Sequence, residues 1–303
     1  MLTLGLDAGG SATRWVLLEA EADRVVARGE VGPFSGHIFD PAVERRCRSA
    51  VAAVAAAALP HAPSRVAGGI TGLGGGSPEA ATIARWLAEA LGLPEEAVTL
   101  GDDMWVPAAS LFAPGAGGIV YAGTGSVGYA IDREGRAVKV GGRGVVIDDA
   151  GGAYWIAVRG LRAVARALDE DADRHPALRD ALAARLGVAD WPTIRAAVYA
   201  ADRGGVAALA PFVADAARAG DAAALAILED AGAELARLGE ILARRLGLTD
   251  LALLGNAVRL HPAIAVALRR HLPAGLALAT PEIDAAHAAA RLAALGRAAP
   301  TGT

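Results

Sequence analysis

A short apolar strand that runs into a glycine-containing turn, followed by two further strands, occurs twice along the chain. The first copy comprises a strand at 2–7, a turn at 8–11 and strands at 13–19 and 24–30. The second copy comprises a strand at 118–122, a turn at 123–126 and strands at 127–132 and 137–140. A repeated unit of this kind indicates an internal duplication, so we predict two α/β domains built on one plan.

The remaining segments predict alternating helices and strands. In the first half we expect helices at 41–59 and 78–91 and strands at 65–71 and 97–100. In the second half we expect helices over most of 151–246, a strand at 250–254, a helix from 262, a strand near 276 and a helix at about 283–295.

Two domains also suit the length of the chain, because 303 residues are too many for one compact core. We assign the first domain to residues 1–112 and the second to 113–303, with a boundary near Pro114 to Gly117. The second domain then contains a helical insertion at 151–247, and the C-terminal helix at about 283–297 could pack back on the first domain.

Composition excludes several classes of protein. The formal net charge of −4 gives no reason to expect a nucleic-acid or membrane partner. The N-terminal residues lack the pattern of a signal peptide, and no uncharged run is long enough to span a membrane, so a cytoplasmic protein is expected. Lys139 is the only lysine and is followed by Val140, which rules out a Walker A motif.

The two glycine turns are candidate phosphate sites. Glycines let a turn expose its backbone N–H groups, and hydroxyls add donors, so such a turn can hold phosphate oxygens without a lysine. An ordinary hairpin is the alternative for either turn alone, but the recurrence of the turn favours phosphate binding. Asp7, at the end of the first strand, could hold Mg²⁺ through water. The residues concerned are Gly9, Gly10, Ser11 and Thr13 in the first turn and Gly123, Thr124, Gly125 and Ser126 in the second.

A carboxylate pair follows the strand at 97–100. Asp102 and Asp103 lie where an α/β sheet usually meets its ligand. A phosphoryl acceptor hydroxyl needs a carboxylate that orients it and takes its proton, whereas an aspartate before a helix can also be a cap. We expect Asp103 to be the base, and Asp102 to be the cap or to have a magnesium-linked role.

Two further glycine-containing segments are weaker candidates. Residues 141–155 are rich in glycine, and Asp148 and Asp149 could accept hydrogen bonds from hydroxyls, although a turn with an aspartate cap is an equal alternative. Gly255 and Asn256 follow the strand at 250–254 and could receive adenine and ribose. A plain strand-to-helix turn explains that pair at least as well.

These motifs together resemble the N-acetylglucosamine kinase-like proteins, which are grouped with the BadF/BadG/BcrA/BcrD ATPases in the actin/hexokinase/Hsp70 superfold. The resemblance covers nearly the whole chain and is carried by segments 4–13, 121–126, 151–156 and 219–228. It implies two ribonuclease-H-like (actin-like ATPase) domains with ATP and Mg²⁺ in a cleft between them.

The resemblance also implies roles for single residues. Asp103 matches the catalytic aspartate that orients the 6-hydroxyl of the sugar, and both glycine turns match phosphate loops. The loop at 32–37 matches one that carries an asparagine sugar ligand, and the segment 142–153 matches the sugar-binding stretch. The substrate-binding residues implied are Ser35, Gly36, His37, Thr124, Gly142, Arg143, Gly144, Asp148, Asp149 and Ala153.

The chain departs from the family pattern around the sugar. The asparagine position is Gly36, or His37 with a shift of one, and Arg143 stands where the family often has tryptophan. Residues 148–151 read Asp-Asp-Ala-Gly where the family often has Gly-Asp-Glu-Gly. The extra aspartate could pair with a free ammonium and favour glucosamine over its N-acetyl form, whereas an arginine could meet an acidic sugar.

We therefore expect an ATP-dependent kinase that phosphorylates the 6-hydroxyl of N-acetylglucosamine or glucosamine. One alternative is a non-catalytic protein that binds sugar and nucleotide. Another is an ATPase that activates a partner reductase through an iron–sulfur cluster, which needs bridging cysteines that the single Cys47 does not supply. The expected partner is a small-molecule sugar, and a homodimer is the expected assembly because related kinases are often dimers.

Overall fold

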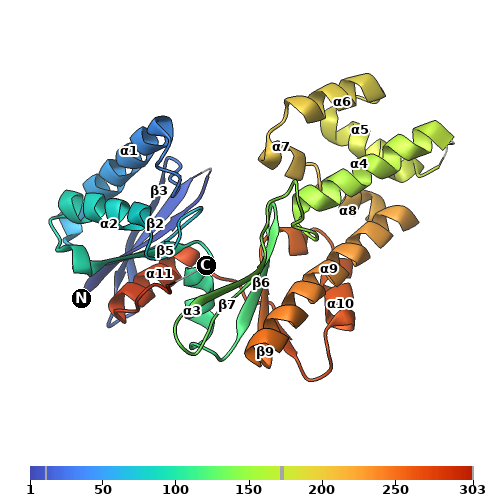
Figure 1. Ribbon diagram of the computed structural model, residues 1–303. Coiled ribbons are helices and arrows are strands. Elements are labelled where there is room, and N and C mark those ends of the chain that lie inside the picture. The colour runs from blue at the N-terminus through green and yellow to red at the C-terminus, as the bar shows by residue number, and fades with distance from the viewer. Residues whose placement is uncertain (11, 171–173, 302–303) are drawn as a thin grey trace. The chain divides into compact units, whose positions relative to one another are not determined.

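The chain folds as two compact units, each built around one five-stranded sheet (Figure 1). The computed structural model describes residues 1–10, 12–170 and 174–301. Unit 1 contains residues 1–117, residues 130–138 and the chain from Glu282 onward, and unit 2 contains residues 118–129 and 139–281. That residues 1–112 and 113–303 are separate domains stays a prediction.

The sheet of unit 1 has the strand order β3-β2-β1-β4-β5. Its first three strands form an antiparallel meander, and β4 and β5 add to β1 in parallel. The strands are β1 (Leu2–Ala8), β2 (Thr13–Glu19), β3 (Arg24–Val31), β4 (Arg65–Ile70) and β5 (Val98–Asp102). β5 runs two residues further than expected, because its parallel pairing with β4 continues to Asp102 opposite Ile70.

The two faces of this sheet are covered by different helices, as the alternation of side chains along β1 requires. Leu4 and Leu6 are fully buried in the core that includes α1 and α2, whereas Gly5 faces α11, where an added Cβ would lie 2.0 Å from the carbonyl oxygen of Ala286. Side-chain caps from Asp40 and Ser77 start α1 and α2. The helical elements are α1 (Pro41–Ala58), η1 (Leu59–His61), α2 (Pro78–Leu91), η2 (Glu95–Ala97), α3 (Trp105–Leu111) and α11 (Ala285–Ala294).

The second sheet has the order β10-β9-β6-β7-β8. Read from its other edge, the second sheet repeats the order of the first. β6, like β1, lies in the centre, and β7 and β8, like β2 and β3, lie to one side of it. β9 pairs in parallel with both β6 and β10. The strands are β6 (Gly118–Ala122), β7 (Ser126–Ile131), β8 (Ala137–Gly141), β9 (Asp250–Leu254) and β10 (Ala277–Ala279). The predicted α/β fold with two similarly built halves is thus confirmed.

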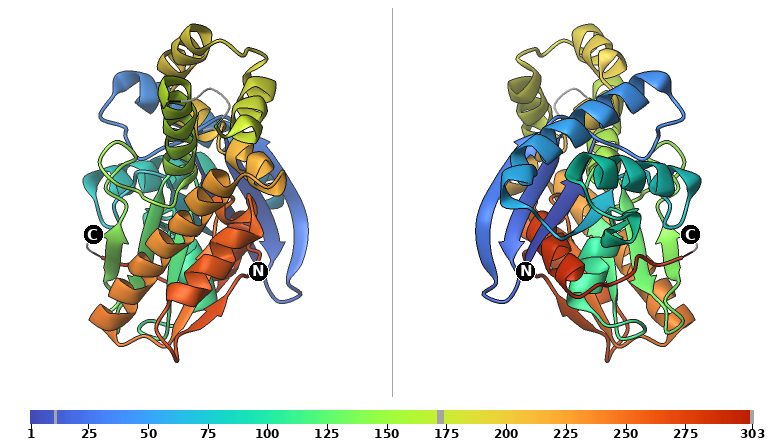
Figure 2. Two further views of the ribbon diagram at one scale, coloured as in Figure 1. Left: turned by 90° about the vertical axis from the view of Figure 1, so that its right-hand side faces the viewer. Right: turned by 90° about the vertical axis from the view of Figure 1, so that its left-hand side faces the viewer.

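Most of unit 2 is helical, as predicted. The long helix α9 packs on β6 and has α10 beside it (Figure 2). Helices α4 to α8 gather at one end of unit 2 (Figure 1). The elements are α4 (Ala153–Glu170), α5 (Pro176–Leu186), α6 (Trp191–Ala200), α7 (Arg203–Ala207), α8 (Pro211–Arg218), α9 (Ala222–Leu246), η3 (Ala257–Arg259) and α10 (Pro262–His271). Within the described residues, every helix is too short or too polar to cross a membrane.

Candidate functional site

Polar side chains of unit 1 meet at the edge of the sheet where the parallel strands β1, β4 and β5 end. Asp7 lies near the end of β1, Thr71 follows β4, and Asp103 follows β5. The hydroxyl of Thr71 donates a hydrogen bond of 2.9 Å to Oδ2 of Asp103. The Asp103 carboxylate is also near enough to Asp7 to raise its pKa. The structure therefore brings the predicted base and the predicted magnesium ligand to one edge.

Asp102 has a structural role at this edge. Its Oδ1 accepts hydrogen bonds from the backbone N–H groups of Met104 at 3.1 Å and Trp105 at 2.8 Å. These N–H groups lie at the start of α3 and have no partner within that helix. These bonds are those expected of a cap, one of the two roles predicted for Asp102, and they orient the turn that carries Asp103.

Burial raises the pKa of Asp7 above its ordinary value, and nearby Asp103 and Asp284 raise it further. Arg14 opposes this shift, with its Nη1 at 3.7 Å from Oδ2 of Asp7. An aspartate with a raised pKa makes the folded state less stable whenever it is ionised. A cation bound at Asp7 would offset the cost of burying its charge near two other carboxylates.

An Asp7→Asn variant is therefore expected to be slightly more stable than the wild type at pH 7. The difference in unfolding free energy between variant and wild type should be fully present at pH values above the raised pKa of Asp7 in the folded state. It should vanish as the pH falls below the pKa of an aspartate in the unfolded chain, near 3.8. Denaturant unfolding at a series of pH values measures it. Glu30→Gln is the matched control, because Glu30 also pairs with Arg14 but is exposed. An Asp7→Asn variant that is less stable than wild type at pH 7 would contradict the prediction.

Hydrogen bonds close the first glycine turn onto the neighbouring loop. The N–H of Gly9 donates to the carbonyl of Ala12 at 2.9 Å, and the N–H of Phe34 donates to the carbonyl of Gly9 at 3.3 Å. The hydroxyl of Thr13 is buried without a partner within the described residues. Gly10 is exposed, with open space around it. Ser11, predicted to bind phosphate, lies outside the described residues.

The loop predicted to bind the sugar packs against the turn after β4. Gly36 is buried, its N–H donates to the carbonyl of Thr71 at 2.9 Å, and an added Cβ would lie 2.6 Å from the carbonyl oxygen of Gly72. An asparagine side chain does not fit at position 36 without movement of this backbone. His37 is exposed, so it is the residue of this pair with a side chain available to a ligand. The thiol of Cys47 donates to the carbonyl of Ser35 and ties the loop to α1.

In unit 2, the second glycine turn is bonded directly to the end of the segment 141–155. The N–H groups of Ala153 and Tyr154, at the start of α4, donate to the carbonyls of Gly123 and Thr124 at 2.9 and 3.0 Å. The hydroxyl of Ser126 donates to the carbonyl of Ala150 at 2.7 Å. Two motifs that are separate in the sequence therefore form one structure.

Asp149 lies at the centre of this structure. Its Oδ1 accepts a hydrogen bond of 3.0 Å from the N–H of Gly144, and a Cβ added to Gly125 would meet its Oδ2 at 2.2 Å. Burial raises the pKa of Asp149, while the backbone bonds from Gly144 and Arg143 and the charge of Arg203 oppose that shift. Asp148 is only partly buried, and its Oδ2 lies 3.7 Å from Nη2 of Arg237. Gly142 and Arg143 are exposed on the same segment.

Gly255 is held against the start of the second glycine turn. It has a φ of +101°, and an added Cβ would lie 2.2 Å from the carbonyl oxygen of Ala122, so only glycine suits this position. Asn256 follows at the start of η3, and its side chain makes no capping hydrogen bond there. The second glycine turn, the segment predicted to bind sugar and the predicted adenosine residues thus lie together in unit 2.

The donors at the edge of the first sheet suit a magnesium ion that arrives with a nucleotide. Within the described residues there is no group of three or more His, Cys, Asp or Glu that could hold a metal by itself. Magnesium in nucleotide sites needs only one or two carboxylates, because phosphate oxygens and water complete its shell. Asp7, with Asp103 nearby, supplies oxygen donors of that kind.

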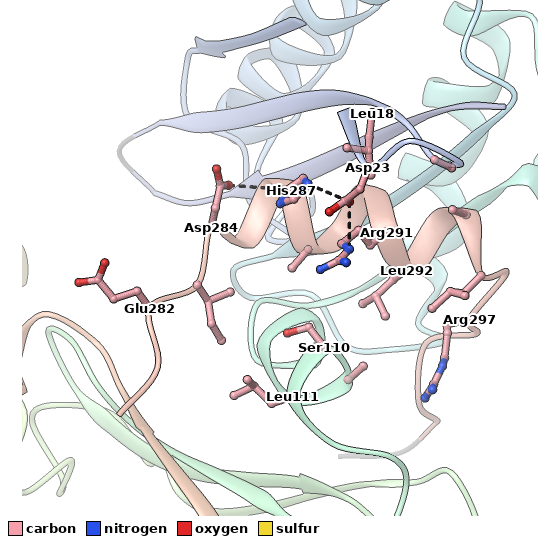
Figure 3. Close-up of a pocket in the computed structure, with 16 residues that line it drawn as sticks. Leu18, Asp23, Ser110, Leu111, Glu282, Asp284, His287, Arg291, Leu292 and Arg297 are labelled. Carbon is pink, nitrogen blue, oxygen red and sulfur yellow. Dashed lines mark hydrogen bonds and ion pairs between the residues drawn. The ribbon is translucent and has the colours of Figure 1, made fainter. Parts of the chain in front are cut away.

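A separate hollow of about 530 Å³ lies in unit 1 between α11, α3 and the turn from β2 to β3 (Figure 3). At one side of it, Oδ1 of Asp23 lies 3.1 Å from Nε of Arg291 and 3.4 Å from Nε2 of His287. Among the described residues, none of those predicted to bind phosphate or sugar lines this hollow. The candidate site is therefore the sheet edge and not this hollow.

Thr71 is a site residue that the sequence alone did not indicate to us. The sequence does carry a pattern that points to it. A threonine directly after a buried strand lies at the same sheet edge as an aspartate that follows the next parallel strand. Tyr154 and Arg203 were also missed, and only the folded helices bring Arg203 near Asp149.

A family model and several solved structures match the chain. The model describes the BadF/BadG/BcrA/BcrD ATPase family and matches residues 4–269. No curated protein gives a significant match. A candidate N-acetylglucosamine kinase from Chromobacterium violaceum is 27% identical, with a TM-score of 0.70 over 96% of this chain and 98% of that chain.

More distant structures share the fold. A candidate N-acetylglucosamine kinase from Porphyromonas gingivalis is 16% identical, with a TM-score of 0.66 over 94% of this chain and 96% of that chain. A ROK family glucokinase from Streptomyces griseus, solved with glucose and AMPPNP, is 16% identical, with a TM-score of 0.59 over 97% and 99%. The fold is therefore that of sugar kinases, and the chain belongs to the BadF/BadG/BcrA/BcrD ATPase family.

Proposed function

We propose that the protein is an ATP-dependent kinase that phosphorylates the 6-hydroxyl of a hexosamine, N-acetylglucosamine or glucosamine. The observation that carries this proposal is the hydrogen-bonded pair of Thr71 and Asp103 beside Asp7 at the ends of parallel strands. A carboxylate held in this way can orient an acceptor hydroxyl and take its proton. Sugar-kinase structures with the same fold support the assignment.

The remaining predicted residues have supporting roles in the proposal. The two glycine turns, at 9–13 and 123–126, would hold the phosphates through backbone N–H groups and hydroxyls. Gly255 and Asn256 would contact adenosine, and Asp149 with the segment 142–153 would bind sugar hydroxyls. Mg²⁺, held at Asp7, would offset the charge that develops on the phosphates.

A coupled ADP-release assay tests the proposal. The panel contains N-acetylglucosamine, glucosamine, glucose, N-acetylmannosamine, N-acetylmuramic acid and a control without sugar, each with ATP and Mg²⁺. We expect strong stimulation by at least one hexosamine and little ADP release without sugar. ATP binding without stimulation by any sugar would overturn the proposed activity and leave a non-catalytic binder.

A Thr71→Val variant is expected to lower kcat about tenfold and to leave the KM for the sugar nearly unchanged. Valine has the shape of threonine but cannot donate the 2.9 Å hydrogen bond that orients Asp103. Thr71→Ser should restore most of kcat, because the hydroxyl returns. The pH profile of kcat is the second readout, since loss of the donor should shift its acidic limb upward. Equal kcat and pH profile in Thr71→Val and wild type would rule out this role.

A further inference from the structure

The chain that follows α11 runs back along the sheet edge of the candidate site. Pro300 is buried, and a Cβ added to Gly75 would meet its carbonyl oxygen at 2.2 Å. A Cβ added to Gly101 would meet the Cβ of Ala299 at 3.3 Å. The two glycines therefore leave the room that residues 299–301, here called the tail, occupy.

These two glycines lie on the segments that carry the candidate base and its hydrogen-bond donor. Gly75 follows Thr71 by four residues, and Gly101 precedes Asp103 by two. The bond between the Thr71 hydroxyl and the Asp103 carboxylate joins the two segments. The tail therefore packs against the segment of each partner in that bond.

The other side of the tail is anchored on the β7–β8 hairpin. The N–H of Ala137 donates to the carbonyl of Thr301 at 3.1 Å, and Thr301 forms a parallel bridge with Arg136. The hairpin turn is itself fixed, because Oδ1 of Asp132 accepts the backbone N–H groups of Glu134 at 3.0 Å and Arg136 at 2.8 Å. The hairpin end at 130–138 belongs to unit 1, as the tail does. The tail is thus held from two sides.

The segment after Thr71 needs support of this kind. Four of the five residues at 72–76 are glycine, which restricts the backbone least of all residues. Its backbone bonds include those from Leu73 to Ile70 at 3.1 Å and from Ser77 to Gly74 at 3.2 Å, and the tail contacts the glycine between them. A catalytic side chain keeps its geometry only when the surrounding residues hold it in place.

We propose that the tail is a strap that positions Thr71 against Asp103, and that Ala299 and Pro300 are positioning residues for phosphoryl transfer. This inference rests on the proposed kinase function and adds a part of the chain to the same site. The tail acts through the hydrogen bond between Thr71 and Asp103, so it affects the transfer step more than sugar binding.

A Gly75→Ala variant tests the strap in the full chain. Gly75 does not have a positive φ, so alanine suits the backbone, but its methyl group would displace the Pro300 carbonyl. We expect kcat to fall about tenfold, as for loss of one hydrogen bond at Asp103, with the KM for the sugar nearly unchanged. The acidic limb of the kcat profile should move upward, as in Thr71→Val. Gly74→Ala is the matched control, because its nearest neighbour would be the Cβ of Ser77 at 3.7 Å.

A double-mutant cycle shows whether the tail acts through Thr71. A chain that ends at Ala298 should lose kcat about tenfold, whereas a chain that ends at Thr301 keeps the contacts of the tail and should match the wild type. In the Thr71→Val background the shorter chain should lose little more, because the bond that the tail supports is already gone. Additive losses, about 100-fold together, would refute a role through Thr71. Equal kcat in the wild type and the chain that ends at Ala298 would refute the strap.

Hydrogen exchange separates failure of the strap from failure of the proposed function. Without the tail, the amides of Leu73 and Ser77 should exchange faster, while those of α1 should not change. If sugar stimulates ADP release and neither exchange nor kcat responds to loss of the tail, the inference is wrong and the kinase assignment stands. If no sugar stimulates the wild type, the kinase assignment and the role of the tail in transfer are both overturned, whatever the exchange rates are.

Discussion

Replacement of Asp103 by asparagine is expected to lower the kcat of sugar-dependent ADP release by about 10³-fold, within the usual range for loss of a general base. Asparagine keeps the size of the side chain and can still accept the hydrogen bond from Thr71, so the fold should be retained. It cannot take a proton from the acceptor hydroxyl. Steady-state kinetics with the best hexosamine measures kcat, and a thermal melt checks that the fold is retained.

Asp102→Ala provides the contrast that identifies the base. Asp102 accepts two backbone hydrogen bonds at the start of α3, so its loss should reduce stability by about 1 kcal/mol, with kcat kept to within tenfold. If Asp102→Ala loses activity and Asp103→Asn keeps it, the two roles are exchanged. If both variants keep sugar-dependent activity, the base is neither residue.

Replacement of Gly152 by alanine is expected to lower kcat/KM for ATP by about 100-fold or more. An added Cβ would lie 2.6 Å from the carbonyl carbon and 2.7 Å from the Cα of Gly125. These are backbone atoms of the second glycine turn, so they cannot move aside without a change in the loop. A displacement of about 1 Å in a positioning element is enough for a loss of this size, and the overpacking should also cost about 1–3 kcal/mol of stability.

Gly204→Ala is the control for this variant. The nearest atom to a Cβ at Gly204 is the Oδ1 of Asp202 at 3.4 Å, which is an ordinary contact, and alanine favours the helical conformation of α7. ATP affinity by fluorescence and turnover by ADP release should both be near the wild-type values in this control. A Gly152→Ala variant with wild-type ATP affinity would show that the second glycine turn does not bind the phosphates.

Local patterns determine much of the architecture. The strand–glycine turn–strand pattern at 2–19 and again at 118–132 predicts both sheet cores, because alternation and glycine turns depend only on nearby residues. Helices α1 and α2 begin at prolines preceded by the capping residues Asp40 and Ser77, and both start where the sequence predicts. The equal strand order of the two sheets is what the predicted duplication leads one to expect.

What the sequence by itself determined was the class of fold, the family and the positions of the glycine turns and carboxylates. Only the tertiary structure decided which carboxylate faces Thr71, how close Asp7 is to Asp103, and that the turn at 123–126 is bonded to Ala150, Ala153 and Tyr154. These interactions join residues as far apart in the sequence as Asp7 and Asp103. Their distances depend on how strands and helices pack, which no local pattern of residues encodes.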